Sequence, residues 1–457
     1  MSNKDKALNS ETFCLLPFTH MATKTDGDLK LCCRSWPVGN INNTTMKELW
    51  NSDKYKEVRR MLLNGEKPKE CDACWRHEKI GVRSMRQRYN KTRTKQYLPA
   101  VDKMSDDFTM PFEIPVIEAK LSNFCNLKCR MCHPLDSTSW SKDWKSIEHL
   151  MQKANGSTYN KVKEYDLTTK PYISAYEKNE EFWDEFKQLA PFLQRIEFAG
   201  GEPLIDPLHY KVLHILKEYG ENIEIKYSTN LTKLNYKKDS VEELWNYFKG
   251  IQLNISIDGV YDVYDYIRQP GNYETVKENI VKIAKHPKIS YIGAAITLQV
   301  YNSFSIPEMI DEFVEECNID IHTHRVNYPK FLDSRVIPMN VRQPIIKNLQ
   351  EYINSLPDKT HPNWSEWRRS NAKDHLTDAI NMLNGGDMTD QIPQFIEFSD
   401  VLDEKQKVKK IIAVLHEKFG NPECALKYET PFELLVAVSL SAQCTDKRVN
   451  IVTEEMF

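Results

Sequence analysis

Six short runs rich in apolar and β-branched residues recur between residues 116 and 326, and they constrain the fold more than any other feature. Segments with helical periodicity separate them. Strands that alternate with helices in this way lie parallel in one sheet. Six units predict an α/β protein with an open, partial (β/α)6 TIM-like barrel rather than a closed barrel of eight. The predicted strands are 116–122, 195–200, 223–230, 251–259, 289–300 and 319–326, and the predicted helices are 207–220, 240–250, 273–286 and 306–317.

The remaining segments give the predicted domain organisation. Residues 1–100 are short of clear strands and rich in cysteine, and a basic stretch near their end, 83–99, is typical of a solvated linker helix or arm. The barrel spans 114–335, and 133–190 is too long for one crossover helix, so we expect a helical insertion that covers the barrel mouth. A helical C-terminal extension, 336–404, is followed by a separate all-helical tail, 405–457.

Composition and cysteine placement indicate the class of protein. Hydrophobic residues make up 40% of the chain, the net charge is −3, and no apolar run approaches the roughly 20 residues of a membrane span. The first 13 residues lack the apolar region of a signal peptide. We therefore expect a cytoplasmic protein with no membrane partner and no general affinity for nucleic acid. In that compartment, the clustering of cysteines indicates metal chemistry rather than disulfides.

The stretch NFCNLKCRMCH, directly after the first predicted strand, has the spacing C-x3-C-x2-C. Its cysteines are Cys125, Cys129 and Cys132. A structural zinc site and an ordinary iron–sulfur cluster each take four protein ligands. A set of three is therefore either one part of a larger set or open to a ligand that is not protein.

Three further polar segments lie at the carboxyl ends of the next three predicted strands. They are GGEP at 200–203, STN at 228–230 and SIDG at 256–259. The carboxyl ends of parallel barrel strands meet at one rim, so we expect these segments to converge on the three cysteines. STN is also compatible with a simple turn in which Asn230 is left-handed, and SIDG with an Asp-Gly turn. We interpret Arg268 as part of a surface salt bridge and Asn302 as a helix cap.

Together these motifs resemble the radical S-adenosylmethionine superfamily, over about residues 116–330. The resemblance implies that Cys125, Cys129 and Cys132 hold a [4Fe–4S] cluster whose fourth iron binds S-adenosylmethionine. It also implies reductive cleavage of that cofactor, hydrogen abstraction from a substrate, and an external electron donor such as flavodoxin or ferredoxin. The implied cofactor-binding residues are Met131, Gly200, Gly201, Glu202, Ser228, Asn230 and Ser256, with Asp258 as a weak catalytic candidate.

The N-terminal cysteines resemble a second family pattern. Cys14, Gly27 and Cys32 match the opening C-x9-15-G-x4-C of SPASM and twitch auxiliary-cluster domains, and Cys71 and Cys74 supply a C-x2-C pair. The resemblance implies a second [4Fe–4S] cluster of the twitch type, for electron transfer or structural support. Cys33 is the spare, with replacement of Cys32 as its alternative role, and a zinc site is the alternative to the cluster. In most relatives this domain follows the barrel, whereas here it precedes it.

The tail TPFELLVAVSLSAQCTD resembles the N-terminal helices of endonuclease III, with Gln443 at the position of a glutamine that enters the DNA stack. The catalytic lysine and aspartate of that family have no counterpart here, so we expect no strand cleavage. The first hypothesis is therefore a radical enzyme acting on a peptide or protein. The alternatives are a DNA-directed protein with the tail as a non-catalytic adaptor, and a zinc-stabilised binding module. Substrate, product and oligomeric state do not follow from the sequence.

Overall fold

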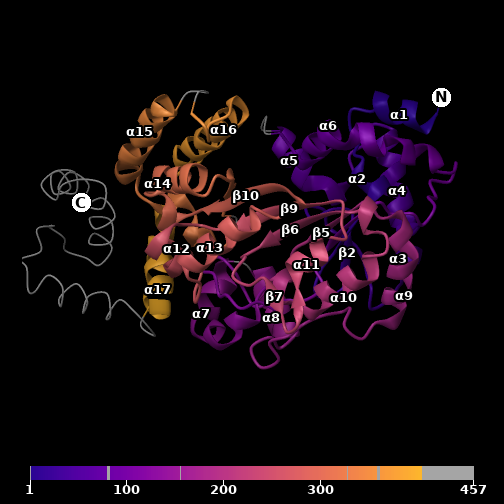
Figure 1. Ribbon diagram of the computed structural model, residues 1–457, viewed down its shortest axis with the longest axis horizontal. Coiled ribbons are helices and arrows are strands. Elements are labelled where there is room, and N and C mark those ends of the chain that lie inside the picture. Colours follow the sequence, from indigo (N-terminus) through magenta and orange to yellow (C-terminus); the bar gives the residue numbers. More distant parts are fainter. Residues whose placement is uncertain (1, 80–82, 155, 327, 358–360, 404–457) are drawn as a thin grey trace, which may run out of the picture.

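A nine-stranded sheet forms the centre of the protein (Figure 1). The structure is a computed structural model that describes residues 2–79, 83–154, 156–326, 328–357 and 361–403. Six consecutive strands of the sheet pair in parallel, which confirms the predicted α/β class and all six predicted strands. They are β4 (Val116–Ala119), β5 (Arg195–Phe198), β6 (Glu224–Thr229), β9 (Gly250–Ser256), β10 (Ile289–Leu298) and β11 (Asp320–Arg325).

Alternating side chains give the sheet one apolar and one polar side. In β6, Ile225 and Tyr227 are buried in the core, whereas Lys226 between them is half-buried. The apolar side packs in the core shared with the connecting helices. These helices are α10 (Pro207–Leu216), α11 (Val241–Trp245), α12 (Tyr261–Ile267), α13 (Tyr273–Ile283) and α14 (Ile306–Asp311).

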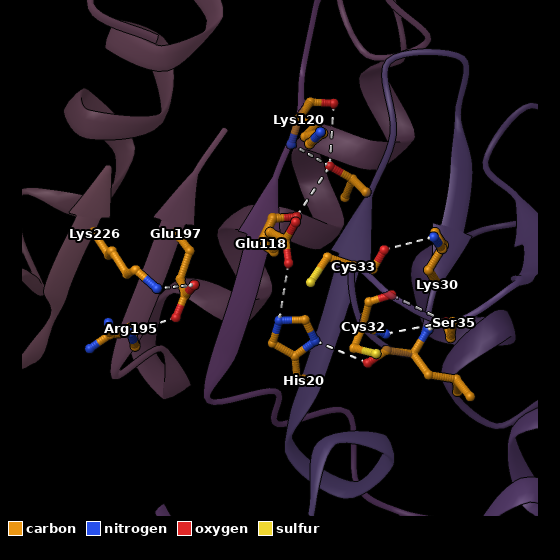
Figure 2. Close-up of polar contacts among 12 residues, drawn as sticks. His20, Lys30, Cys32, Cys33, Ser35, Glu118, Lys120, Arg195, Glu197 and Lys226 are labelled. Atoms are coloured by element: carbon orange, nitrogen blue, oxygen red, sulfur yellow. Dashed lines mark hydrogen bonds and ion pairs between the residues drawn. The ribbon is translucent and has the colours of Figure 1, made fainter. Parts of the chain in front are cut away.

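The opposite side carries a row of polar residues in register, which we call the polar face. It is made up of Glu118, Glu197, Lys226 and Gln252 on four neighbouring strands. Lys226 Nζ donates to Glu197 over 3.3 Å, and Arg195 Nε donates to the same carboxylate over 2.7 Å (Figure 2). Charged residues on a central sheet need such partners, so this face is built for polar contacts rather than for apolar packing.

The cysteine-rich N-terminal segment extends the same sheet. Strand β1 (His20–Thr23) pairs in parallel with β4, and β2 (Asp28–Lys30) and β3 (Pro37–Asn40) follow in antiparallel order. The prediction that residues 1–100 lack clear strands is therefore wrong. These strands have three or four residues each, which is too short for an alternating pattern to stand out.

Helices make up the rest of the described chain. The segment 133–190 contains α7 (Ser141–Ala154), α8 (Gly156–Glu164) and α9 (Glu180–Leu189). After β11 come α15 (Met339–Ser355), α16 (Glu366–Leu383) and α17 (Ile392–Asp403). The N-terminal helices are α1 (Asn3–Asn9), α2 (Leu16–Thr19), α3 (Met46–Trp50), α4 (Asp53–Leu63), α5 (Asp72–Lys79) and α6 (Met85–Tyr97). No helix among the described residues is long and apolar enough to cross a membrane. The predicted tail, 405–457, lies outside the described residues.

Candidate functional site

The three-cysteine loop, residues 122–133, leaves the carboxyl end of β4 and rests directly on the GGEP segment. Gly201 N donates to Ser122 O over 3.2 Å, and Glu202 N donates to Phe124 O over 2.7 Å. The structure therefore brings two of the predicted motifs into backbone contact, as the alignment of parallel strand ends predicts.

The two glycines of GGEP are needed for that contact. Gly200 has φ +113°, a conformation that side-chain-bearing residues rarely adopt. A Cβ atom on Gly201 would lie 2.2 Å from Phe124 O and 2.7 Å from the carbonyl carbon of Asn123. Position 201 is therefore occupied by glycine because two backbones approach each other closely there, and no polar side chain is involved.

The other side of the loop is held by two separate segments. Lys128 N donates to Gln269 O over 2.6 Å, and Arg130 N donates to Ile267 O over 2.9 Å, just after α12. The indole Nε1 of Trp140 donates to Cys129 O over 3.0 Å. The loop is therefore fixed by hydrogen bonds along most of its length.

Arg130, between the second and third cysteines, connects the loop to the end of the described chain. Its guanidinium lies 3.7 Å from the ring centroid of Tyr266 and forms an ion pair with Asp403 of α17. The side chain is buried, so both contacts offset the cost of removing its charge from water.

The three thiols lie in an environment that disfavours their free ionised form. Burial, together with the charges of Cys129 and Glu202, raises the pKa of the Cys125 thiol to about 12. Burial also raises the pKa of Cys129, and it raises that of Cys132 well above its usual value, with charges of the neighbouring thiols adding to the effect on Cys132. Because a metal ligates thiolates, a bound metal centre would supply the positive charge that this site lacks.

Glu202 is buried, and its carboxylate accepts hydrogen bonds that include those from the end of β6. Its Oε1 accepts from Leu204 N over 3.0 Å and from Thr229 Oγ1 over 2.5 Å, and its Oε2 accepts from Asn230 N over 2.6 Å. Burial raises the pKa of Glu202 to about 7 against these hydrogen bonds. The carboxylate therefore ties GGEP to the STN segment, and an ionised carboxylate still has acceptor capacity for one further donor.

Asp258 and Arg268 form a buried ion pair that reaches the second cysteine. Arg268 Nη2 lies 2.6 Å from Asp258 Oδ2, and Arg268 Nη1 lies 3.5 Å from Cys129 Sγ. Both side chains are buried, so the interpretation of Arg268 as part of a surface salt bridge is wrong. Asp258 Oδ1 also accepts from Thr297 N over 2.6 Å. These contacts favour a positioning role for Asp258 over its predicted catalytic role.

The remaining predicted residues occupy different places around the loop. Asn230 Nδ2 lies 4.0 Å from Cys125 Sγ and donates to Asn126 Oδ1 over 3.1 Å. The left-handed residue of this turn is Leu231, with φ +54°, rather than Asn230. Ser228 is exposed, and Ser256 and Met131 are half-buried. Asn302 accepts from Gln299 N over 2.9 Å, so it takes part in a capping box in which Gln299 is the N-cap residue.

A second cavity brings together the four predicted N-terminal cysteine ligands. Its lining residues are Cys14, Cys32, Cys71, Cys74, Leu16, Pro17, Leu31, Arg34, Ser35, Ala73 and Arg86. Cys33 is not among them, and its Sγ lies 3.7 Å from Met85 Sδ. The geometry therefore favours Cys32 over Cys33 as the fourth ligand.

Local structure explains how Cys32 is aimed at this cavity. Gly27 has φ +89° in the turn between β1 and β2, which accounts for glycine in the spacing before Cys32. Ser35 Oγ accepts from Leu31 N over 3.0 Å and donates to Cys32 O over 3.2 Å. Burial, together with the charge of Cys14, raises the pKa of Cys32 to about 12.

Helix α6, which lies within the basic stretch 83–99, positions Cys14. The sequence analysis interpreted this stretch as a solvated linker helix or arm and did not predict this role. Asn90 donates to Phe13 O over 2.8 Å and accepts from Leu15 N over 3.0 Å, so it clamps both neighbours of Cys14. Arg86 also donates to Phe13 O over 2.8 Å and pairs with Glu78 over 2.8 Å. The only sequence signal for this role was the interruption of a basic run by Asn90 and by the capping residue Ser84.

The four cysteines that line this second cavity are a ligand set that suits both an iron–sulfur cluster and zinc.

Two family models match the segments that contain the two cysteine sets. Residues 120–299 match the Radical SAM superfamily, and residues 14–75 match the iron-sulfur cluster-binding domain known as SPASM. The chain therefore contains a Radical SAM domain, preceded by an iron-sulfur cluster-binding domain. These domains imply S-adenosylmethionine, a [4Fe–4S] cluster and an additional iron–sulfur cluster as cofactors.

The solved structures that match part of the chain include two of SuiB from Streptococcus suis. The structure bound to S-adenosylmethionine is 18% identical, with a TM-score of 0.30, and the match covers 52% of this chain and 44% of SuiB. The structure bound to the precursor peptide SuiA is 14% identical, with a TM-score of 0.31, and the match covers 68% of this chain and 62% of SuiB.

A short stretch of the chain is similar to endonuclease III. The protein from Synechocystis sp. is 48% identical over 54 residues, and that from Haemophilus influenzae is 51% identical over 53 residues. These stretches are 12% of this chain and 25% of each relative. The chain therefore spans about a quarter of the length of these relatives, which supports the presence of a fragment similar to endonuclease III.

Proposed function

We propose that this radical enzyme abstracts hydrogen from a carbon atom of a peptide or protein substrate. The cluster and S-adenosylmethionine, when bound, supply a 5′-deoxyadenosyl radical for that step. The proposal is carried by the shared sheet: β1 follows the cavity residues Cys14, Leu16 and Pro17 in the chain and pairs with β4, which leads into the three-cysteine loop. Radical enzymes with an auxiliary-cluster domain of this type often modify peptides, which makes a peptide the favoured substrate class.

Each part of the site then has a role in the proposed reaction. Cys125, Cys129 and Cys132 hold the radical cluster, and Arg268 positions Cys129 through its hydrogen bond. The residues proposed to bind the cofactor are Met131, Gly200, Gly201, Glu202, Ser228, Asn230 and Ser256. The six parallel strands act as an open (β/α)6 barrel with these groups at its carboxyl rim.

The auxiliary site has a separate proposed role. Cys14, Cys32, Cys71 and Cys74 hold the additional cluster, which we take to be a [4Fe–4S] cluster because four thiolates complete its coordination. A cluster ligated fully by protein has no iron free for S-adenosylmethionine. It therefore serves electron transfer or structural support, while flavodoxin or ferredoxin is the proposed external electron donor.

Deuterium transfer tests the proposed substrate class. Producing cells are grown on deuterated medium and separated into a digested protein fraction and a small-molecule fraction. The reduced, cluster-loaded enzyme is incubated with S-adenosylmethionine and either fraction, and 5′-deoxyadenosine is analysed by mass spectrometry. We expect deuterium in the product only with the peptide fraction, because the radical would take its hydrogen from a peptide carbon. Labelling from the small-molecule fraction alone would contradict a peptide substrate.

The similarity to endonuclease III favours a second candidate function, in which the tail is a non-catalytic DNA adaptor.

We expect that the tail is not needed for the radical reaction. A variant ending at Glu404 should form 5′-deoxyadenosine at the rate of the full chain, within about twofold. We also expect that the full chain does not nick a duplex with an abasic site, because the similar stretch is only 25% of each endonuclease III relative. Rates of both reactions are compared for the two proteins. Tighter duplex binding by the full chain, by about tenfold or more, would support the adaptor.

A further inference from the structure

Lys24 and Lys120 stand side by side at the ends of two paired strands. Lys24 follows β1, and Lys120 follows β4, in the register where Ala22 lies opposite Glu118. Lys120 N donates to Thr23 Oγ1 over 2.9 Å, which fixes the two strand ends to each other. Figure 2 shows Glu118 on β4 and Lys120 just after this strand, with the Cys33 side chain near Glu118.

The two ammonium groups repel each other. The charge of Lys120 is the main cause that lowers the pKa of Lys24, to about 8, and burial adds to the effect. Both side chains are half-buried. Among the described residues, neither ammonium forms an ion pair with a carboxylate within 4.0 Å. The charge of Asp136 is the main cause that raises the pKa of Lys120, so this carboxylate stabilises the Lys120 ammonium group. Lys24 is left as the less stable cation of the pair, and a bound anion would stabilise it.

The charged groups around the pair leave a net positive charge. Asp136 lies 3.5 Å from His133 Nε2, and its side chain keeps 34% of its surface exposed. Burial opposes ionisation of Asp136, but the charges of Lys120, His133 and Lys24 outweigh it and lower the pKa to about 2. Lys30 Nζ donates to Cys33 O over 3.0 Å. The formal charge of this group of side chains is +1, because it contains three lysines and two carboxylates: Lys24, Lys30, Lys120, Asp136 and Glu118.

The pair also lies between the two cluster sites. His133 directly follows Cys132 of the three-cysteine loop, and its partner Asp136 interacts electrostatically with Lys120. On the other side, Cys33 interacts with Lys120 and is the neighbour of Cys32 in the auxiliary cavity. A Cβ on Gly200 of GGEP would lie 3.5 Å from Lys120 Cα. A ligand on the two lysines would therefore border the radical site and the auxiliary site together.

We propose that Lys24 and Lys120 bind a carboxylate of the substrate, supplied by an acidic residue of the peptide. This inference rests on the proposed peptide substrate and adds the type of residue that the enzyme selects. A carboxylate carries one negative charge, which matches the net charge of the surrounding groups, whereas a phosphate dianion would leave an excess. Charge-assisted hydrogen bonds from two ammonium groups would fix the peptide beside the radical site.

Peptide retention tests this site. Two mixtures of acetylated, amidated pentapeptides are prepared, with Asp or Asn at the centre and all other positions randomised without acidic residues. Each is equilibrated with the anaerobic, cluster-loaded full chain, and retained peptides are measured by mass spectrometry. We expect the wild type to retain the Asp mixture at least about tenfold better than the Asn mixture. The variant Lys24→Met/Lys120→Met should lose that preference, and Lys347→Met, an exposed lysine of α15, should keep it.

Three results would overturn the assignment. They are equal retention of the two mixtures by the wild type, retention of neither, and an unchanged preference in the double variant. A fall in S-adenosylmethionine affinity of the double variant by about tenfold or more would also overturn it, because the lysines would then bind the carboxylate of the cofactor. The wild-type comparison needs no variant, so a double variant that fails to fold does not remove the test. Deuterium transfer from peptides without an acidic preference would refute this site alone and leave the proposed function standing.

Discussion

Replacing Cys125, Cys129 and Cys132 together with alanine is expected to abolish formation of 5′-deoxyadenosine. The physical reason is that the three thiolates are the proposed ligands of the cluster that binds S-adenosylmethionine, so no other part of the site can compensate. We expect a fall of at least about 1000-fold in rate, which corresponds to about 4 kcal/mol of activation free energy. The measurement is the rate of deoxyadenosine formation by anaerobically reconstituted protein with a chemical reductant.

Iron analysis separates this effect from general unfolding. The triple variant should lose about half of its iron, because four further thiolates line the auxiliary cavity and hold the second cluster. Cys317→Ala is the matched control, since Cys317 is also buried but lies after α14, outside both cysteine sets. It should keep all iron and full activity. A triple variant that retains all its iron would show that these cysteines are not ligands.

The main strands could be predicted because their alternation with helices spans the whole barrel segment. The apolar residues Ile225 and Tyr227 on either side of Lys226 mark β6 clearly, and the structure confirms it. Strands β1 to β3 gave no such signal. They are short, and their stability comes from pairing with β4 and with each other, which no local pattern reveals.

The cysteine ligands and the glycines were visible in the sequence because their spacing is tied to chemistry. Positions that act through a distant partner were not. Arg268 is 139 residues from Cys129 in sequence, and Asn90 is 75 residues from Leu15. In both cases, the side chain supports a cysteine loop from another element, and nothing in the neighbouring residues distinguishes it from a surface side chain. Likewise, only the pairing of β1 with β4 brings Lys24 beside Lys120.

A small substitution in GGEP should have the second largest effect, although it removes no functional group. In Gly201→Ala the added methyl would meet Phe124 O at 2.2 Å, so the backbone of the three-cysteine loop must move. Overpacking against backbone costs about 1–3 kcal/mol. We therefore expect the free energy of unfolding to fall by this amount. Because the displaced loop carries Cys125 next to Phe124, we also expect the affinity for S-adenosylmethionine to fall by about tenfold or more.

The control for this prediction is Gly386→Ala, because no atom lies within 4 Å of a Cβ at Gly386. It should change the free energy of unfolding by less than about 0.5 kcal/mol and leave cofactor affinity unchanged. Denaturant unfolding and anaerobic titration with S-adenosylmethionine measure the two quantities for each variant. If Gly201→Ala behaved like the control in both, the loop would be free to yield. The hydrogen bond from Glu202 N to Phe124 O would then not hold the three cysteines in place, and the residue type at Gly201 would need another explanation.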